Sequence, residues 1–300
     1  MEILRTNMEH RGKNKHFFRV CFLTAILFLI GAEILYSNYA LMVTRYNILS
    51  DKVIGEVRVV FLTDLHGREF GAGNSRLLDR ITVEKPDLIA LVGDIFNQDA
   101  DEHEIDRMCW FIQRASAIAP VYFGLGNHEM SYLKAHGTDL LGRIQQSGAV
   151  VLESDFLDVE INDTPFRIGG YMAYYRQPRM LTTERERIES EIAFAEEFES
   201  TDRFKLLLNH IPTAWLDWNC IYEYPVDLVL SGHYHGGLIR IPVLEQGLVA
   251  PDVGFFPPYT KGVFSGSEAT CILGTGLAGS RLPRFFNPPE IAVVDILPEK

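Results

Sequence analysis

The stretch VRVVFLTDLHGREFGAGNSRLLDRITVEKPDLIALVGD, residues 57–94, decides the fold. It begins with a β-rich apolar run at 57–62, which predicts a strand, and continues with a helical pattern at 74–85. A second β-rich run at 88–91 predicts another strand. Because strands and helices alternate, the stretch predicts an α/β protein with a layered core.

The rest of the body continues this alternation. We predict a helix at 103–117, a strand at 121–124, a hairpin at 156–170, an acidic helix at 183–198, and strands at 205–208 and 228–230. The charges of the acidic helix are interpreted as a solvated helix face. Beyond Gly237 the chain is rich in Gly and Pro with short apolar runs, which indicates a second sheet.

The N-terminus has the pattern of a membrane-targeting segment. Five basic residues precede a strongly apolar stretch at 20–32, and the extended run 17–36 is about 20 residues, which is long enough to cross a bilayer. A cleaved signal peptide is the alternative, but no A-x-A-like cleavage site precedes the next polar residues, so we expect a retained anchor. The chain is therefore divided into an anchor or signal segment, 1–50, and a globular domain, 51–300.

Basic residues set the expected orientation of this anchor. They are concentrated before the apolar run, whereas Arg45, Lys52 and Arg58 are the nearest basic residues after it. Because Lys and Arg favour the cytoplasmic side of a membrane, we expect a single-pass protein with a cytoplasmic N-terminus and an extracytoplasmic domain. The net charge of −12 argues against a nucleic-acid-binding surface, which normally requires clustered Lys and Arg.

Polar residues of one chemical kind stand where predicted strands end. These are Asp64 and His66 in TDLHG, Asp94 in LVGDIFN, Asn127 and His128 in LGNHE, His210 in LLNHIP, and His233 and His235 in SGHYHGG. Open α/β sheets place ligand sites at the carboxyl ends of strands, so these loops are expected to converge on one pocket. Their oxygen and imidazole ligands suit borderline and hard divalent metals. Each block alone is common, and the same Asp and Asn residues often cap helices or turns.

The ordered set resembles the calcineurin-like metallophosphoesterases, whose blocks are Asp-x-His, Gly-Asp, Gly-Asn-His-Glu or Asp, His, and Gly-His-x-His. All five blocks occur in this order between Asp64 and His235. The segments GHYHGGLIRIP and LAGSRLPRFFNPPEI also look like the membrane-associated branch typified by the YkuE and YaeI phosphoesterases. This resemblance implies a four-layer α/β/β/α sandwich, the metallophosphoesterase fold, preceded by an N-terminal transmembrane helix.

The resemblance also implies a site for two divalent metal ions. The first ion would be bound by Asp64, His66, Asp94 and His235, and the second by Asp94, Asn127, His210 and His233. Asp94 would bridge the two ions, which lie about 3.5–4 Å apart in such sites and activate a bridging hydroxide. Mn²⁺ is the expected metal, and Fe or Zn²⁺ are the alternatives.

His128 is left free of the metals in this scheme and is the expected catalytic residue. It would stabilise the phosphoryl charge or protonate the leaving group, with Glu129 or Asn97 orienting its ring. Arg281 is a further candidate for a phosphate contact, although an arginine in a C-terminal loop is more often a surface residue.

The implied function is a membrane-anchored hydrolase of phosphodiester or pyrophosphate bonds, with 51–300 as its catalytic domain. Its substrate is a phosphate ester, and the anchor favours a lipid-linked one. The segments GDIFNQD and GLGNHE lack the arginines of protein Ser/Thr phosphatases. One alternative is a UDP-2,3-diacylglucosamine-type pyrophosphate hydrolase of lipid A synthesis, whose nucleotide substrate would require a cytoplasmic site. Another is a non-catalytic metal-binding membrane scaffold.

Overall fold

The computed structural model describes residues 2–137, 139–171, 174–176, 183–279 and 283–299, with side chains from residue 16 onward. Two six-stranded sheets form its centre. In spatial order, the first contains β1 (Met42–Ser50), β16 (Glu290–Pro298), β2 (Val57–Leu62), β3 (Leu88–Val92), β4 (Val121–Gly124) and β5 (Ala149–Leu152). The second contains β14 (Gly262–Ser265), β15 (Thr270–Leu273), β9 (Leu228–Ser231), β8 (Phe204–Leu208), β7 (Thr164–Gly170) and β6 (Asp155–Ile161).

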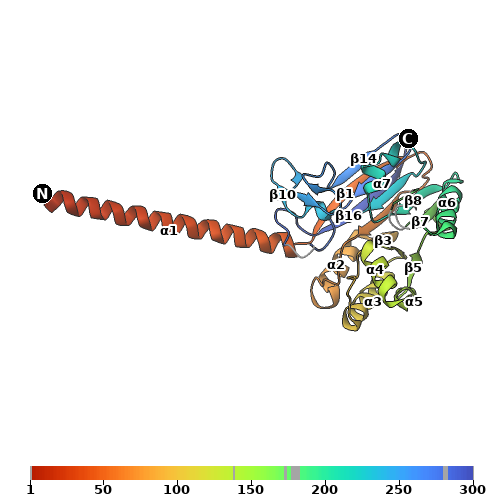
Figure 1. Ribbon diagram of the computed structural model, residues 1–300, viewed down its shortest axis with the longest axis horizontal. Helices are drawn as coiled ribbons and strands as arrows, with labels where there is room; N and C mark the ends of the chain where they lie inside the picture. The colour runs from red at the N-terminus through yellow and green to blue at the C-terminus, as the bar shows by residue number, and fades with distance from the viewer. Residues whose placement is uncertain (1, 138, 172–173, 177–182, 280–282, 300) are drawn as a thin grey trace.

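Helices cover the outer face of each sheet. The first sheet is covered by α2 (Ser75–Glu84), α3 (Glu102–Ser116), α4 (Asn127–His136) and α5 (Asp139–Gln146), and the second by α6 (Arg185–Glu199) and α7 (Thr213–Leu216). Single-turn helices η1 (Ala72–Asn74), η3 (Cys220–Tyr222) and η4 (His235–Gly237) lie in the connections. Figure 1 shows α2, α3, α4 and α5 on one side of the body and α6 on the other.

The alternation of side chains along the strands explains the four layers. In β2, Val60 and Leu62 pack under the helices of the first sheet, whereas Val59 and Phe61 face the second sheet. In β8 the inward residues include Leu206, and the outward Leu207 packs with the residues of α6. The predicted four-layer α/β/β/α sandwich is therefore confirmed.

The predicted elements are found with small shifts at their ends, but the sheet assignment beyond Gly237 was incomplete. Strands β14 and β15 do join the second sheet, whereas β16 returns to the first sheet and lies between β1 and β2. Four two-residue strands, β10 (Arg240–Ile241), β11 (Gln246–Gly247), β12 (Val249–Ala250) and β13 (Gly254–Phe255), form two separate ribbons. Local periodicity marks a strand but does not select its distant partner.

Strand β1 lies in residues that we had assigned to the N-terminal segment 1–50. It pairs in parallel with β16 over its whole length, from Met42 beside Glu290 to Ser50 beside Pro298. The first sheet therefore begins at Met42, nine residues before the domain start expected at residue 51.

Helix α1 (Glu2–Tyr39) projects away from the body, as Figure 1 shows. Its segment His16–Tyr39 has a mean hydropathy of 2.1 and is long enough to cross a membrane. Large apolar side chains in it are bare, including Phe22 at 67% and Phe28 at 74% exposure. An exposed apolar helix of this length fits either a membrane span or a signal sequence.

The last turns of α1 are held on the body by polar contacts. The Glu33 carboxylate accepts the Phe286 N–H at 2.9 Å, and the Ser37 hydroxyl accepts the Asn287 N–H at 3.1 Å. The Asn38 side-chain oxygen accepts the N–H of Arg284 at 3.2 Å. The helix is thus fixed to the segment that leads into β16, as well as to β1 through the chain itself.

Arg284 is the buried centre of that segment. Its guanidinium is fully enclosed and donates to the carbonyls of Thr275, Gly276, Ala278 and Asn287 at 2.6–3.0 Å. Burial lowers the pKa of Arg284 to about 10, and Asp64 and Glu290 oppose this shift, so the group stays charged near neutral pH. One side chain therefore pairs four backbone acceptors at once.

Arg284→Met should lower the free energy of unfolding by at least about 3 kcal/mol, because each buried carbonyl left unpaired costs about 1–3 kcal/mol. Thermal unfolding of the full chain in neutral detergent measures the change as a lower Tm. Arg185→Met is the control, because the Arg185 side chain is 88% exposed. Equal Tm values for the two variants would contradict this account of Arg284.

Candidate metal centre

The predicted site residues all follow the carboxyl ends of parallel strands in both sheets. Asp64 and His66 follow β2, Asp94 follows β3, Asn127 and His128 follow β4, His210 follows β8, and His233 and His235 follow β9. The two sheets pack face to face, so these ends meet at one edge of the sandwich. The structure thus brings all eight residues to one place, as expected for an α/β ligand site.

The backbone around these residues is strained. Asp64, His66, Asp94, His233 and His235 adopt φ values of 54°, 49°, 53°, 69° and 48°. This left-handed region costs about 1–3 kcal/mol for a residue with a side chain and persists only where the surroundings enforce it. Here loop-to-loop hydrogen bonds do so, since Asp64 N–H donates to the Gly93 carbonyl at 3.1 Å and His66 N–H to that of Asp94 at 2.9 Å.

The first predicted ligand group surrounds the Asp64 carboxylate. Its Oδ1 lies 3.7 Å from Nε2 of His235 and 3.9 Å from Nε2 of His66. Asp94 Oδ2 lies 3.8 Å from the same His66 nitrogen. The His235 ring is held from its other side, where Nδ1 lies 3.2 Å from the Ala278 carbonyl. Separations of this size between carboxylate oxygens and imidazole nitrogens leave room for a cation between them.

The second predicted group adjoins the first through Asp94. Asp94 Oδ2 lies 3.3 Å from Nε2 of His210, and ligand atoms of Asp94, His210 and His233 all lie within 4.8 Å of one another. The Val92 carbonyl holds Nδ1 of His210 at 2.8 Å, which directs Nε2 to the carboxylate. Asn127, the first residue of α4, is the predicted amide ligand of this group.

Glu129 organises the loop that carries Asp94. Its buried carboxylate accepts the N–H groups of Asp94, Ile95 and Gly126 at 2.8 Å and that of Phe96 at 3.0 Å. Burial and the Asp94 charge raise the pKa of Glu129 to about 7, while these N–H donors lower it. Gly126 has to lack a side chain, because a Cβ there would lie 2.3 Å from Oδ1 of Asp94.

The expectation that Glu129 or Asn97 orients His128 was wrong. Glu129 binds the backbone groups above, and the Asn97 amide donates to the His66 carbonyl and to Glu104. The backbone N–H of Gln98 instead contacts Nδ1 of His128 at 3.2 Å. A neutral ring that accepts at Nδ1 carries its proton on Nε2, and this atom lies 3.9 Å from Asp94 Oδ2, facing the cluster.

The electrostatics of the site are governed by two buried carboxylates. Burial alone would raise the pKa of Asp64 and Asp94, but the surrounding imidazoles hold both pKa values below the usual range. The pKa of His210 moves to about 10, because Asp94 and Asp64 outweigh the lowering by burial, whereas burial lowers the pKa of His66 to about 4. Two buried anions therefore require positive charge beside them.

The donor atoms fit a metal ion. Among the described residues, Nε2 of His66, Nε2 of His210 and Oδ1 of Asn127 are buried without a hydrogen-bond partner. An unpaired buried polar atom is costly in a folded protein. A cation, taking the place of the proton on His210, would satisfy all three atoms. Carboxylate, imidazole and amide donors together suit a divalent ion, although they do not select one metal.

Two further residues of the site carry no sequence motif. Asp252 Oδ2 lies 2.8 Å from Nε2 of His233, which leaves the Nδ1 atom of that ring for a metal. Arg68 lines the cavity above the cluster, a space of about 640 Å³. Asp252 lies in the turn between β12 and β13, and Arg68 follows the TDLHG block, so the fold and not a motif identifies them. Arg281 lies outside the described residues.

Comparisons with known proteins agree with this geometry. The family model described as "Calcineurin-like phosphoesterase" matches residues 57–237. An uncharacterized metallophosphoesterase of Aquifex aeolicus is 25% identical over 281 residues, 90% of this chain and 97% of the relative. The metallophosphoesterase YkuE of Bacillus subtilis is 40% identical over 91 residues, only 30% of each chain. The UDP-2,3-diacylglucosamine pyrophosphatase LpxG of Chlamydia trachomatis is 25% identical over 313 residues, covering 86% of this chain and 90% of LpxG.

Asp94→Asn should weaken binding of two divalent ions per chain, because Asp94 contacts both ligand groups. Loss of a residue that hydrogen-bonds to a metal ligand typically lowers metal affinity by about 10–100-fold. Loss of the ligand itself should lower the apparent affinity for Mn²⁺ by more than this. Elemental analysis after dialysis and calorimetric titration measure this. Asp99→Asn is the matched control, because Asp99 lines the cavity outside both groups. Unchanged Mn²⁺ binding by Asp94→Asn would refute the assignment.

Proposed function

The chain belongs to the calcineurin-like phosphoesterase family, and from this premise we propose that it is a membrane-anchored phosphoesterase that cleaves phosphodiester or pyrophosphate bonds in lipid-linked substrates. Family membership supports phosphoester hydrolysis, and the donor set supports a divalent-metal requirement. The chain spans less than two thirds of YkuE, so the substrate is inferred from this molecule's own geometry.

The position of Arg68 carries the proposal for a lipid-linked substrate. Arg68 lines the metal-site cavity, and its guanidinium donates to the Asn38 carbonyl in the last turn of α1. The same group lies 4.8 Å from the centre of the Tyr39 ring. One side chain therefore connects the cavity to the end of the apolar helix. A substrate phosphate in the cavity would lie close to the lipids that surround α1.

The proposed chemistry assigns separate roles to the residues of the cluster. Divalent ions bound there would supply positive charge to phosphoryl oxygens and lower the pKa of water. Asp64, Asp94, Asn127 and the histidines His66, His210, His233 and His235 would hold those ions. His128 would stabilise charge on the phosphoryl group by donating an Nε2–H hydrogen bond to one of its oxygens, because the Gln98 N–H occupies the opposite nitrogen.

The LpxG match favours a second candidate, hydrolysis of a UDP-linked diacylated sugar at its pyrophosphate. That substrate is also a lipid carrying phosphate, so the position of Arg68 suits it equally. Its nucleotide would require the body to lie in the cytoplasm. From the distribution of basic residues we propose the opposite orientation, with an extracytoplasmic body. The nucleotide-linked substrate therefore ranks second.

His128→Ala should lower kcat by about 10²–10³-fold with metal content unchanged, as expected for loss of a hydrogen-bond donor to the transition state. The assay compares a chromogenic phosphodiester, a phosphomonoester, a lipid-linked pyrophosphate and a UDP-linked diacylglucosamine, with Mn²⁺ present. His136→Ala is the control, because His136 is exposed at the other end of α4. Metal-loaded protein without turnover on any substrate would instead support the non-catalytic scaffold.

Protease treatment of intact cells tests the proposed orientation. An extracytoplasmic body should be digested by external protease while a cytoplasmic marker protein survives. Complete protection of the body in intact cells, followed by digestion after the membrane is opened, would reverse the orientation. That result would also favour the nucleotide-linked substrate over the other lipid-linked substrates.

A further inference from the structure

Exposed apolar side chains gather in the loops that contain β10 to β13. Val243 is 98% exposed, Leu244 71%, Phe255 75% and Phe256 61%. Val243 and Leu244 form the tip of the β10–β11 hairpin, and Phe255 ends β13. Large apolar residues grouped at loop tips are unfavourable in water and indicate a surface that another apolar phase covers.

These loops are connected to the end of α1 by a continuous series of contacts. Glu33 in α1 accepts the Phe286 N–H, and the neighbouring Phe285 forms a bridge with Ile239, directly before β10. The Arg240 N–H then donates to the Phe285 carbonyl at 2.9 Å. Figure 1 shows β10 on the side of the body from which α1 projects. Strand β10 therefore lies on the same side of the body as the end of the apolar helix.

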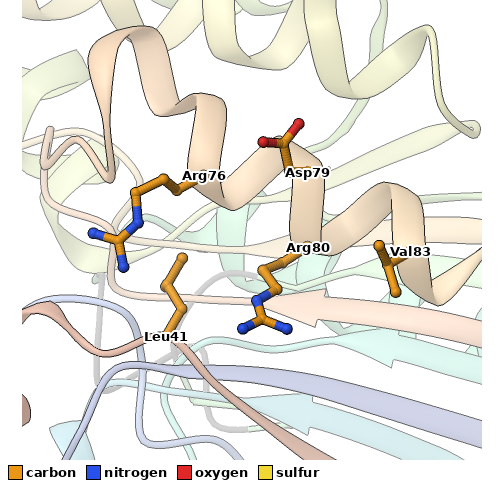
Figure 2. Close-up of a pocket in the computed structure, with 5 residues that line it drawn as sticks. All are labelled: Leu41, Arg76, Asp79, Arg80 and Val83. Carbon is orange, nitrogen blue, oxygen red and sulfur yellow. The ribbon is translucent and has the colours of Figure 1, made fainter.

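A second feature of the same face is a basic pocket beside the start of β1. It has a volume of about 320 Å³ and is lined by Leu41, Arg76, Asp79, Arg80 and Val83. Figure 2 shows the two guanidinium groups turned toward Leu41 and the Asp79 carboxylate turned away. Arg76 donates to the Tyr39 carbonyl at 3.3 Å, so the pocket adjoins the last residue of α1.

We propose that this face, comprising the β10–β13 loops and the basic pocket, is a membrane-contacting surface for anionic phospholipid. The loop tips enter the apolar edge of the bilayer around α1, and Arg76 and Arg80 bind lipid phosphates. This inference rests on the proposed membrane insertion of α1. Apolar residues beside arginines match the boundary between acyl chains and anionic headgroups.

The membrane-contacting surface would attach the body to the bilayer at a second point besides α1. With α1 as its one membrane contact, the whole molecule could still rotate about the helix axis and tilt with the helix, whereas a second contact on the same face holds the body against the bilayer. Arg68 contacts the end of α1 and lines the metal-site cavity. A fixed body would therefore keep that cavity at the headgroup level, where a lipid-linked phosphate is found.

Tryptophan substitutions in the full chain test loop insertion. The variants Phe28→Trp in α1, Phe256→Trp in the loops and Ile54→Trp are placed in nanodiscs with plain or brominated acyl chains. Bromine quenches only tryptophans that reach the acyl region, and wild-type emission is subtracted to remove the native tryptophans. Ile54 is 67% exposed and follows β1, whose nine residues span about 30 Å from α1.

Phe28→Trp and Phe256→Trp should both lose their added emission in brominated nanodiscs, and Ile54→Trp should keep it. If Phe28→Trp is quenched but Phe256→Trp behaves like Ile54→Trp, the membrane-contacting surface is refuted and the anchor stands. If Phe28→Trp is not quenched, the proposed anchor itself fails.

The basic pocket is tested with short-chain phosphatidylglycerol added to the full chain in neutral detergent. Phosphatidylglycerol should raise the Tm of wild-type protein, whereas phosphatidylcholine and inorganic phosphate should not. The double variant Arg76→Gln/Arg80→Gln should lose this shift and Arg185→Gln should keep it. A shift that survives in the double variant, or an equal shift with inorganic phosphate, would overturn the lipid assignment of the pocket.

Discussion

The carboxylates of Asp64 and Asp94 are buried close together, at 0% and 1% exposure. The rest of the site stabilises these two negative charges. Their negative charges are faced by the imidazoles of His66, His210 and His235 at 3.3–3.9 Å. Desolvated anions are stable only beside positive charge, so the loops must present such groups in fixed positions. The left-handed backbone of the candidate ligands is the conformational cost of that requirement.

Rigid surroundings make this strained arrangement possible. The two sheets and their three apolar layers fix where each strand ends, and Glu129 and Arg284 then hold the connecting loops through backbone hydrogen bonds. Glu129 binds N–H groups around Asp94, whereas Arg284 binds carbonyls, including the Ala278 carbonyl that also contacts His235. A buried carboxyl group and a buried guanidinium thus each organise a loop beside the cluster.

The apolar helix is joined to this framework rather than loosely tethered to it. Its last turns contact the Arg284–Asn287 segment, and its end contacts Arg68 at the edge of the metal-site cavity. The route from the helix to the metal centre therefore passes through packed and hydrogen-bonded groups. On this continuity we base the proposal of a lipid-linked substrate.

The strands and helices of the core and the family could be predicted from the amino-acid sequence, because periodicity and ordered motifs are local properties of the chain. The sequence also indicated the apolar helix, and the candidate metal ligands and the role of His128 remain predictions drawn from its motifs. The pairing of β16 between β1 and β2, the contact of Gln98 with His128, and the places of Asp252 and Arg68 beside the cluster are seen in the folded structure and not in the sequence. These contacts join residues that are distant in the chain or carry no motif, so their partners are set by how the two sheets pack and bring their loops together.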